Sequence, residues 1–223
     1  MLLLAADTSG KHGSIAFARA ESDSLEVVEI VPLLGGTFSA QLVPQIAALL
    51  SKHGFSKQEV GGFAVASGPG SFTGLRVGLA AIKALAEVLH KPIAAVSRLE
   101  AVAVASGAQG RLMVALDAGR GEVYVGGYEV NAGSAKCIEE GILTREGLGH
   151  AFDDRVVVTP DASVAEMARS AGVKVHEIEH PRSDVIAQIG WKKIRAAETV
   201  SPEELEANYI RRSDAEIFAK PAR

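Results

Sequence analysis

The residues best suited to chemistry are two aspartates that each end a short apolar run. Asp7 follows LLLAA, and Asp117 follows LMVAL. A carboxylate in this position, followed by hydroxyls such as those of Thr8 and Ser9, can orient a magnesium-bound phosphate. The same arrangement also fits a purely structural turn, in which the carboxylate accepts a backbone N–H two residues later. The residue types alone leave both roles open.

A glycine-rich segment, SGPGSFTGLRVG at 67–78, offers a second possible phosphate site. It joins a predicted buried strand at 61–66 to a predicted helix at 73–90, and backbone N–H groups in such a turn can hold an anion. The segment matches neither the Walker A nor the GxGxxG pattern. The alternative is local, with two glycines shaping the turn and Ser71 or Thr73 capping the helix. The candidate phosphate-binding residues are Asp7, Thr8, Ser9, Gly68, Gly70, Ser71, Thr73 and Asp117.

The helix that follows carries Gly74 and Gly78 four residues apart, and therefore on one face. Each interior glycine costs about 1 kcal/mol relative to alanine, so close approach of another backbone is the natural compensation. We predict that this face receives a partner's helix in preference to a phosphate. A second predicted helix at 40–53, capped by Ser39, has an apolar face of its own. The predicted interface residues are Leu42, Ile46, Leu49, Gly74, Leu75, Gly78, Leu79 and Ile82.

The elements around the two aspartates are duplicated. LLLAADTSGKHGSIAFA near the start and LMVALDAGRGEVYVGGY in the middle each predict a strand, a glycine-bearing turn and a returning strand. Strands and helices alternate elsewhere, which indicates two similar α/β lobes. The segment SGAQG at 106–110 predicts the division, with an N-terminal lobe at 1–106 and a C-terminal lobe and tail at 107–223.

Composition restricts the remaining functions. The 223 residues carry a net charge of −4 and one cysteine, Cys137, so neither a basic nucleic-acid-binding protein nor a multi-cysteine zinc site is indicated. HEIEH at 176–180 fits the zinc-peptidase pattern, but alternating residues before it and Pro181 after it predict a strand, where that chemistry fails. The basic pair at 211–212, with Lys192, Lys193 and Arg195 upstream, indicates either an RNA contact or a solvated face. No membrane span or signal peptide is expected, and we predict a cytoplasmic protein.

Four segments resemble the TsaB (YeaZ) family of accessory proteins in tRNA threonylcarbamoyladenosine (t6A) synthesis. They are ADTS at 6–9, SGPGSFTGLRVG at 67–78, VSRLEA at 96–101 and LDAGRGEVY at 116–124. The likeness is close over about 1–125 and weak beyond, apart from PR at 181–182 and YIRR at 209–212.

The resemblance implies a two-lobed actin/Hsp70/sugar-kinase-like fold, built by duplication of a ribonuclease H-like motif. It also implies a non-catalytic scaffold that dimerises with the catalytic paralogue TsaD and works with the ATPase TsaE. That complex transfers a threonylcarbamoyl group from its adenylate to N6 of adenosine 37 in tRNA, so tRNA would be met through the complex. In this family the predicted helices at 40–53 and 73–90 would form the interface with TsaD, and alone the chain is expected to form a homodimer through the same two helices.

The resemblance bears on catalysis as well. TsaD binds its metal through a motif of the form VHHMEGH, and the matching stretch here is VSRLEAV at 96–102, with Arg98 and Val102 replacing the two histidines. It therefore implies no catalytic residue, no bound metal and no required cofactor, only weak vestigial affinity for ATP or ADP with magnesium. The alternative is a stand-alone ATP-binding enzyme of the sugar-kinase-like superfamily, with Asp7 and Asp117 flanking its cleft.

Overall fold

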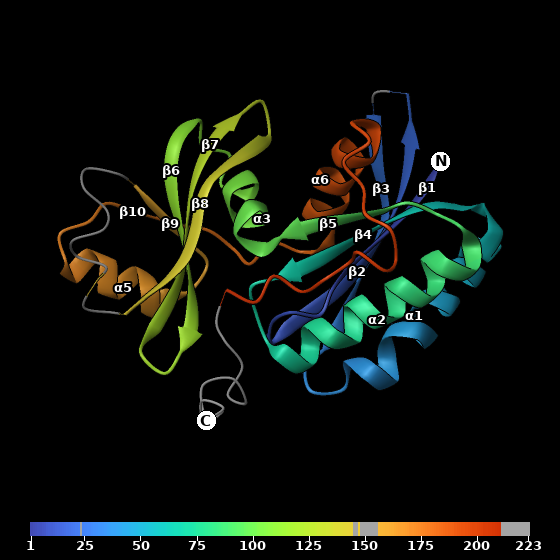
Figure 1. The fold of residues 1–223 in the computed structure, drawn as a ribbon, viewed down its shortest axis with the longest axis horizontal. Helices are drawn as coiled ribbons and strands as arrows, with labels where there is room; N and C mark the ends of the chain where they lie inside the picture. Colours follow the sequence, from blue (N-terminus) through green and yellow to red (C-terminus); the bar gives the residue numbers. More distant parts are fainter. Residues whose placement is uncertain (23, 145–146, 148–155, 211–223) are drawn as a thin grey trace, which may run out of the picture.

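Two five-stranded sheets form the framework of the protein (Figure 1). The computed structural model describes residues 1–22, 24–144, 147 and 156–210. The first sheet, in the order β3-β2-β1-β4-β5, consists of β1 (Leu2–Asp7), β2 (His12–Glu21), β3 (Ser24–Leu34), β4 (Val60–Gly68) and β5 (Ile93–Ser97). The second, in the order β10-β9-β6-β7-β8, consists of β6 (Gly110–Gly119), β7 (Glu122–Asn131), β8 (Ser134–Thr144), β9 (Val157–Thr159) and β10 (Val175–Glu177).

The two sheets have the same topology. In each, the first strand pairs antiparallel with the second and parallel with the fourth: β1 with β2 and β4, and β6 with β7 and β9. The third strand extends the antiparallel side, and the fifth extends the parallel side. The predicted duplication and the two-lobed α/β class are therefore confirmed.

Two long helices cover one face of the first sheet. They are α1 (Phe38–Lys52) and α2 (Phe72–Leu89), with a short 3-10 helix η1 (Lys57–Glu59) between them. The Oγ of Ser71 accepts the N–H of Gly74 at 3.3 Å, so Ser71 is the cap of α2, one of the two predicted. The prediction that Ser39 caps α1 is wrong, because that helix begins at Phe38 after Thr37.

The helices between the two sheets are exchanged between the halves of the chain. Helix α3 (Arg98–Ala105), from the first half, buries Leu99 and Val102 against the second sheet. Helix α6 (Ser183–Arg195), from the second half, buries Ile186 and Ile189 against the first. Figure 1 shows both helices between the sheets, with α5 (Ala162–Ser170) packed on the other face of the second sheet.

The strands of the two sheets follow the predicted division into 1–106 and 107–223, but the helices between the sheets cross it. Helix α3 packs with the second lobe, whereas α6 and the chain after it pack with the first. The N–H of Val200 donates to the carbonyl of Ile93 at 2.9 Å, and that of Asn208 donates to Ser67 at 2.7 Å. Leu205, between them, is buried in the first lobe's core. Sequence position does not assign these two helices because each sheet needs an apolar helix on both faces, and the helix that covers its inner face comes from the other half.

No helix within the described part of the chain is long and apolar enough to cross a membrane.

Candidate functional site

A cleft of about 1050 Å³ lies where the ends of β1 and β6 face one another, and residues of both lobes line it. Six of the residues predicted to bind phosphate are brought together there: Asp7, Ser9, Gly70, Ser71, Thr73 and Asp117. Two strand ends more than a hundred positions apart in the sequence therefore form one site, as the duplication predicted.

Both aspartates are held in the structural turn that was the simpler of their two predicted roles. The N–H of Ser9 donates to Oδ1 of Asp7 at 2.8 Å, and the hydroxyl of Ser9 donates to the same oxygen. In the second lobe, the N–H of Gly119 donates to Oδ1 of Asp117 at 2.9 Å. Each carboxylate thus stabilises the turn that follows it, and one oxygen of each is already engaged.

Thr8 and Gly68 do not line the cleft, and their assignment as phosphate contacts is corrected. The Oγ1 of Thr8 donates to the carbonyl of Gly74 at 2.7 Å, which ties the end of β1 to α2. Gly68 has φ of +120°, and a Cβ there would lie 2.9 Å from the carbonyl oxygen of Asn208. Both residues hold backbone segments together and face the interior of the first lobe.

The cleft also contains charged groups that the residue pattern did not assign to it. The Nε of Arg98 lies 3.9 Å from Oδ2 of Asp7, and its Nη1 donates to the carbonyl of Pro69 at 3.4 Å. Asp161 accepts the N–H of Asp117 at 2.8 Å, and its other oxygen lies 3.4 Å from Nε2 of His180. Asp161 follows the end of β9, so the strand-end rule that selected Asp7 could have found it.

His180 is the titratable group most affected by these surroundings. Burial lowers its pKa, Asp161 opposes that change, and the positive charge of Arg98 and the ring of His12 add to the lowering. The net direction of the pKa shift is downward from the ordinary value, so these surroundings disfavour the protonated imidazole. The rings of His12 and His180 lie 6.1 Å apart, and both line the cleft.

The cleft residues do not fit a magnesium ion held by Asp7. One oxygen of Asp7 accepts two bonds from Ser9, and the other faces the guanidinium of Arg98. Among the described residues, no three acidic, histidine or cysteine side chains are arranged to hold a metal ion. The HEIEH segment agrees with its predicted strand character, because β10 ends at Glu177 and His180 lies beyond it, so the two histidines do not share a helix.

The eight predicted interface residues are all buried within this chain. Leu42, Ile46, Leu49, Leu75, Leu79 and Ile82 are buried in the first lobe's core, and Gly74 and Gly78 are buried on the same face of α2. A Cβ at Gly74 would overlap the carbonyl oxygen of Thr8, and one at Gly78 would overlap its Oγ1, both closer than the 3.0 Å that real contacts keep. The glycines therefore receive the turn after β1, and the prediction that they receive a partner's helix is corrected.

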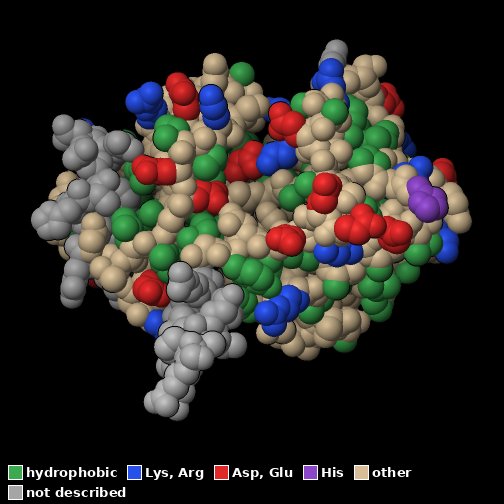
Figure 2. Space-filling model, viewed as in Figure 1, with side chains coloured by type: hydrophobic (Ala, Val, Ile, Leu, Met, Phe, Trp, Pro, Cys, Tyr) green, Lys and Arg blue, Asp and Glu red, His purple; other side chains and the backbone are tan. Residues whose placement is uncertain are grey.

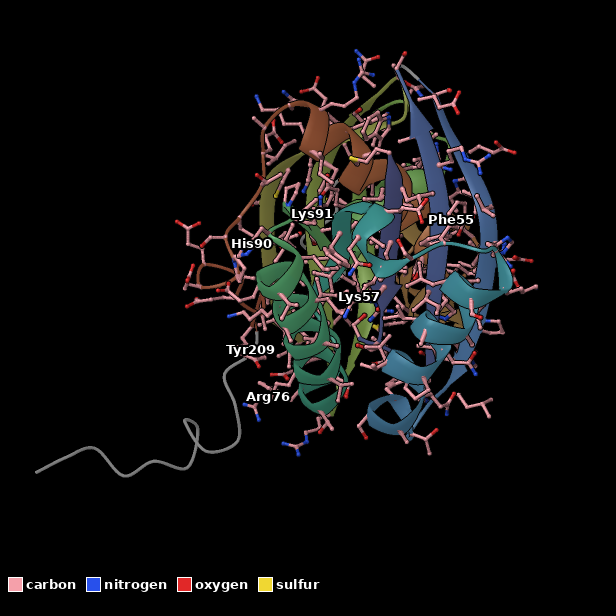
Figure 3. The ribbon with its side chains drawn as sticks, turned by 90° about the vertical axis from the view of Figure 1, so that its right-hand side faces the viewer. Phe55, Lys57, Arg76, His90, Lys91 and Tyr209 are labelled. Atoms are coloured by element: carbon pink, nitrogen blue, oxygen red, sulfur yellow. The ribbon has the colours of Figure 1, made fainter. Side chains whose placement is uncertain are left out.

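The outward face of α1 is mostly apolar, whereas that of α2 combines apolar residues with the exposed charged residues Arg76 and Glu87. Val43 of α1 is 51% exposed and Val88 of α2 is 69% exposed. Figure 3 shows the two helices side by side, with Arg76 and Tyr209 near one end of α2 and His90 and Lys91 at the other. We call the exposed apolar residues of α1 the outer face of α1: Ala40, Val43, Pro44, Ala47 and Ala48.

The predicted basic patch lies partly outside the described residues, since 211–212 are not among them. Upstream, Lys193 lies 2.7 Å from Glu100, and Lys192 donates to the carbonyl of Gly133 at 2.6 Å. Arg195 packs over the ring of Trp191. On the face shown in Figure 2, acidic and basic side chains are interspersed. The described part of this patch is therefore engaged in contacts within the chain.

Comparisons with known proteins agree with this geometry. The family model for TsaD, tRNA N6-adenosine threonylcarbamoyltransferase, matches residues 30–144, about half of the chain. The Bacillus subtilis tRNA threonylcarbamoyladenosine biosynthesis protein TsaB is 37% identical over 135 residues, which cover 60% of this chain and 57% of that protein. The chain spans about half the length of the curated TsaB relatives it matches.

Solved structures match over nearly the whole chain. YeaZ from Pseudomonas aeruginosa aligns with a TM-score of 0.76 and 25% identity, covering 93% of this chain and all of that one. A second Pseudomonas aeruginosa structure, described as similar to peptidase YeaZ, aligns with a TM-score of 0.79 and 25% identity, covering 94% and 99% of the two chains. The chain therefore belongs to the TsaD family that the model describes, and its relatives place it among the TsaB (YeaZ) proteins.

Proposed function

We propose that this protein is a non-catalytic subunit of the complex that transfers a threonylcarbamoyl group to N6 of adenosine 37 in tRNA. It would dimerise with TsaD, work with the ATPase TsaE in the cytoplasm, and meet tRNA through the complex. The observation that carries the proposal is the fold it shares with YeaZ together with its TsaB relatives, which are named for t6A biosynthesis.

The cleft supports a non-catalytic role. Asp7 and Asp117 each use a carboxylate oxygen to close a turn, and Asp7 also faces Arg98. A general base or metal ligand needs a carboxylate oxygen free to reach the reacting group, and both oxygens of Asp7 already face partners, whereas Asp117 is engaged through Oδ1. The transfer chemistry would accordingly reside in the catalytic paralogue.

The outer face of α1 is the surface we propose for docking. It carries no charged side chain before Lys52, and its alanines and Pro44 are small enough for a second helix to approach closely. Val43 and Val88 supply exposed apolar area that a partner would remove from water. Without TsaD, the same face would pair two copies of this chain.

Reconstitution tests this function directly. We expect t6A to form in tRNA when this chain is added to purified TsaD, TsaE and threonylcarbamoyl-adenylate, and not when either this chain or TsaD is left out. Nucleoside mass spectrometry measures the product. Full t6A formation by TsaD and TsaE without this chain would contradict the proposal.

A stand-alone ATP-binding enzyme is the second candidate, favoured by the size of the cleft and by carboxylates from both lobes that line it. It predicts phosphate release from ATP by this chain alone, abolished by Asp7→Ala. We expect no phosphate release above the level of the Asp7→Ala variant, which would separate the two functions.

A further inference from the structure

Two aromatic rings and an arginine come together at the start of α2. The rings of Phe72 and Tyr209 stack with their centroids 4.8 Å apart and their planes inclined by 22°. The Cζ of Arg76 lies 5.9 Å from the centre of each ring, and its Nε donates to the hydroxyl of Tyr209 at 3.2 Å. Figure 3 shows Arg76 and Tyr209 together at this end of α2. We call these three residues the stacking cluster.

The stacking cluster is open to solvent. Tyr209 is 42% exposed, and it is the one aromatic side chain among the exposed large apolar residues that the structure describes. Arg76 is exposed as well. Phe72 reaches the rim of the cleft between the lobes, but neither Arg76 nor Tyr209 is among the residues that line it. An exposed aromatic ring beside a cation is typical of a binding surface, and this one lies outside the cleft.

The segment that carries Tyr209 is fixed by contacts with both lobes. The N–H of Asn208 donates to the carbonyl of Ser67 in the first lobe at 2.7 Å. Its side-chain amide donates to Oε2 of Glu140 in the second lobe, also at 2.7 Å. Leu205 is buried in the first lobe's core. The ring of Tyr209 is therefore positioned before any ligand arrives, which reduces the entropy that binding would cost.

The chemistry of the stacking cluster favours a nucleobase as its ligand. Aromatic side chains stack on unpaired bases, and an arginine beside them can hold a phosphate oxygen. The outer face of α1, which is apolar and built of small residues, suits a helix instead. Three exposed carboxylates precede Tyr209 in its segment, so few phosphates can be held nearby and stacking must supply most of the affinity. They belong to Glu203, Glu204 and Glu206.

We propose that the stacking cluster binds an unpaired base of RNA, with Arg76 holding the phosphate beside that base. The exposed side of the Phe72–Tyr209 stack receives the base, and the stack continues through it. The choice of tRNA as the natural RNA rests on the proposed function, since tRNA offers unpaired bases in its loops and at its 3′ end. The chain would then contact tRNA directly, and not only through TsaD.

Fluorescence anisotropy of the full chain with a labelled single-stranded oligoadenylate of about eight nucleotides tests the proposal. We expect Tyr209→Ala to bind about tenfold more weakly than wild type, as for loss of one stacked base, and Tyr209→Phe to bind within about threefold of wild type. Arg76→Ala should bind about fivefold more weakly. Arg19→Ala is the matched control, because Arg19 is an exposed arginine that also lies over an aromatic ring, and it should bind as wild type.

Three results would overturn the proposal: no binding of the oligonucleotide by wild type, equal binding by Tyr209→Ala, or equal binding of an RNA duplex, whose bases are already stacked. Thermal unfolding confirms that each variant is folded, and Tyr209→Leu replaces Tyr209→Ala if the latter is not. If Tyr209→Ala weakened association with TsaD but not RNA binding, the cluster would be a protein contact and the proposal would be wrong.

The outcome is separable from that of the proposed function. Oligonucleotide binding is measured without TsaD, whereas the proposed function is tested by t6A formation in the reconstituted complex. Loss of the first with the second intact would reject only the RNA contact. Failure of t6A formation with oligonucleotide binding intact would reject only the role in the complex.

Discussion

At the scale of single residues, the two glycines of α2 show what spacing can and cannot predict. Gly74 and Gly78 do mark a close backbone approach, as their cost in a helix requires. The approaching group is Thr8 of the same chain, not a partner's helix. Spacing cannot distinguish these cases, because a helix packs closely in the same way against a turn of its own lobe or against another protein.

Gly74→Ala tests this contact. Alanine should favour the helix by about 1 kcal/mol, but its Cβ would overlap the carbonyl oxygen of Thr8, so we expect a net loss of about 3 kcal/mol in the free energy of unfolding. Ala84→Gly, at an exposed position of the same helix, should cost only about 1 kcal/mol. Urea denaturation measures both, and equal costs would rule out the overlap.

The cleft residues divide according to how local their contacts are. The turns at Asp7 and Asp117 could be predicted because each aspartate bonds to a backbone N–H two residues later. Arg98 could not be assigned to the cleft from the residue pattern alone, because its partner Asp7 is distant in the sequence. His180 could not be assigned either, because its partner Asp161 follows a strand of only three residues.

At the scale of elements, the packing of α3 against α6 joins the two lobes. Lys193 of α6 lies 2.7 Å from the carboxylate of Glu100 on α3, and both side chains are mostly shielded from water. Burial raises the pKa of Glu100, and the charge of Lys193 opposes that rise. The folded state therefore binds this proton more tightly than the unfolded state does.

Lys193→Met should make stability more dependent on pH. The stabilisation from protonated Glu100 is present below its unfolded pKa near 4.5 and is lost as pH rises through the folded value. Without the lysine we expect a cost of about 3 kcal/mol at about pH 8 and clearly less at about pH 5. Lys192→Met, which removes an exposed ammonium that bonds to backbone carbonyls, should cost a similar small amount at both pH values. If the free energy of unfolding of the two variants changed with pH in the same way, the prediction for Lys193→Met would be contradicted.

At the scale of the whole molecule, the duplication could be predicted, but the exchange of helices could not. The matching strands around Asp7 and Asp117 are local patterns, and both sheets follow them. Which sheet α3 or α6 covers depends on packing between distant segments, because both helices carry apolar faces that would suit either sheet.

The exchange predicts that the lobes fold together. A fragment of residues 1–106 would lack α6 and leave one apolar face of the first sheet exposed, so we expect it not to fold alone. The full chain should unfold in one transition, with far-UV circular dichroism and the fluorescence of its single tryptophan, Trp191, changing together. A soluble fragment with a cooperative unfolding transition would show that the halves are independent.

The central claim is that the chain is a docking subunit, and its association with TsaD tests this most directly. Light scattering during size exclusion should show a heterodimer for wild type. Val43→Glu, at a 51% exposed position on the outer face of α1, should weaken association about tenfold or more, because docking would bury an unpaired charge. Ile138→Glu, at a 53% exposed position on β8, is the matched control and should associate as wild type. No heterodimer with wild type, or equal association by Val43→Glu, would contradict the claim.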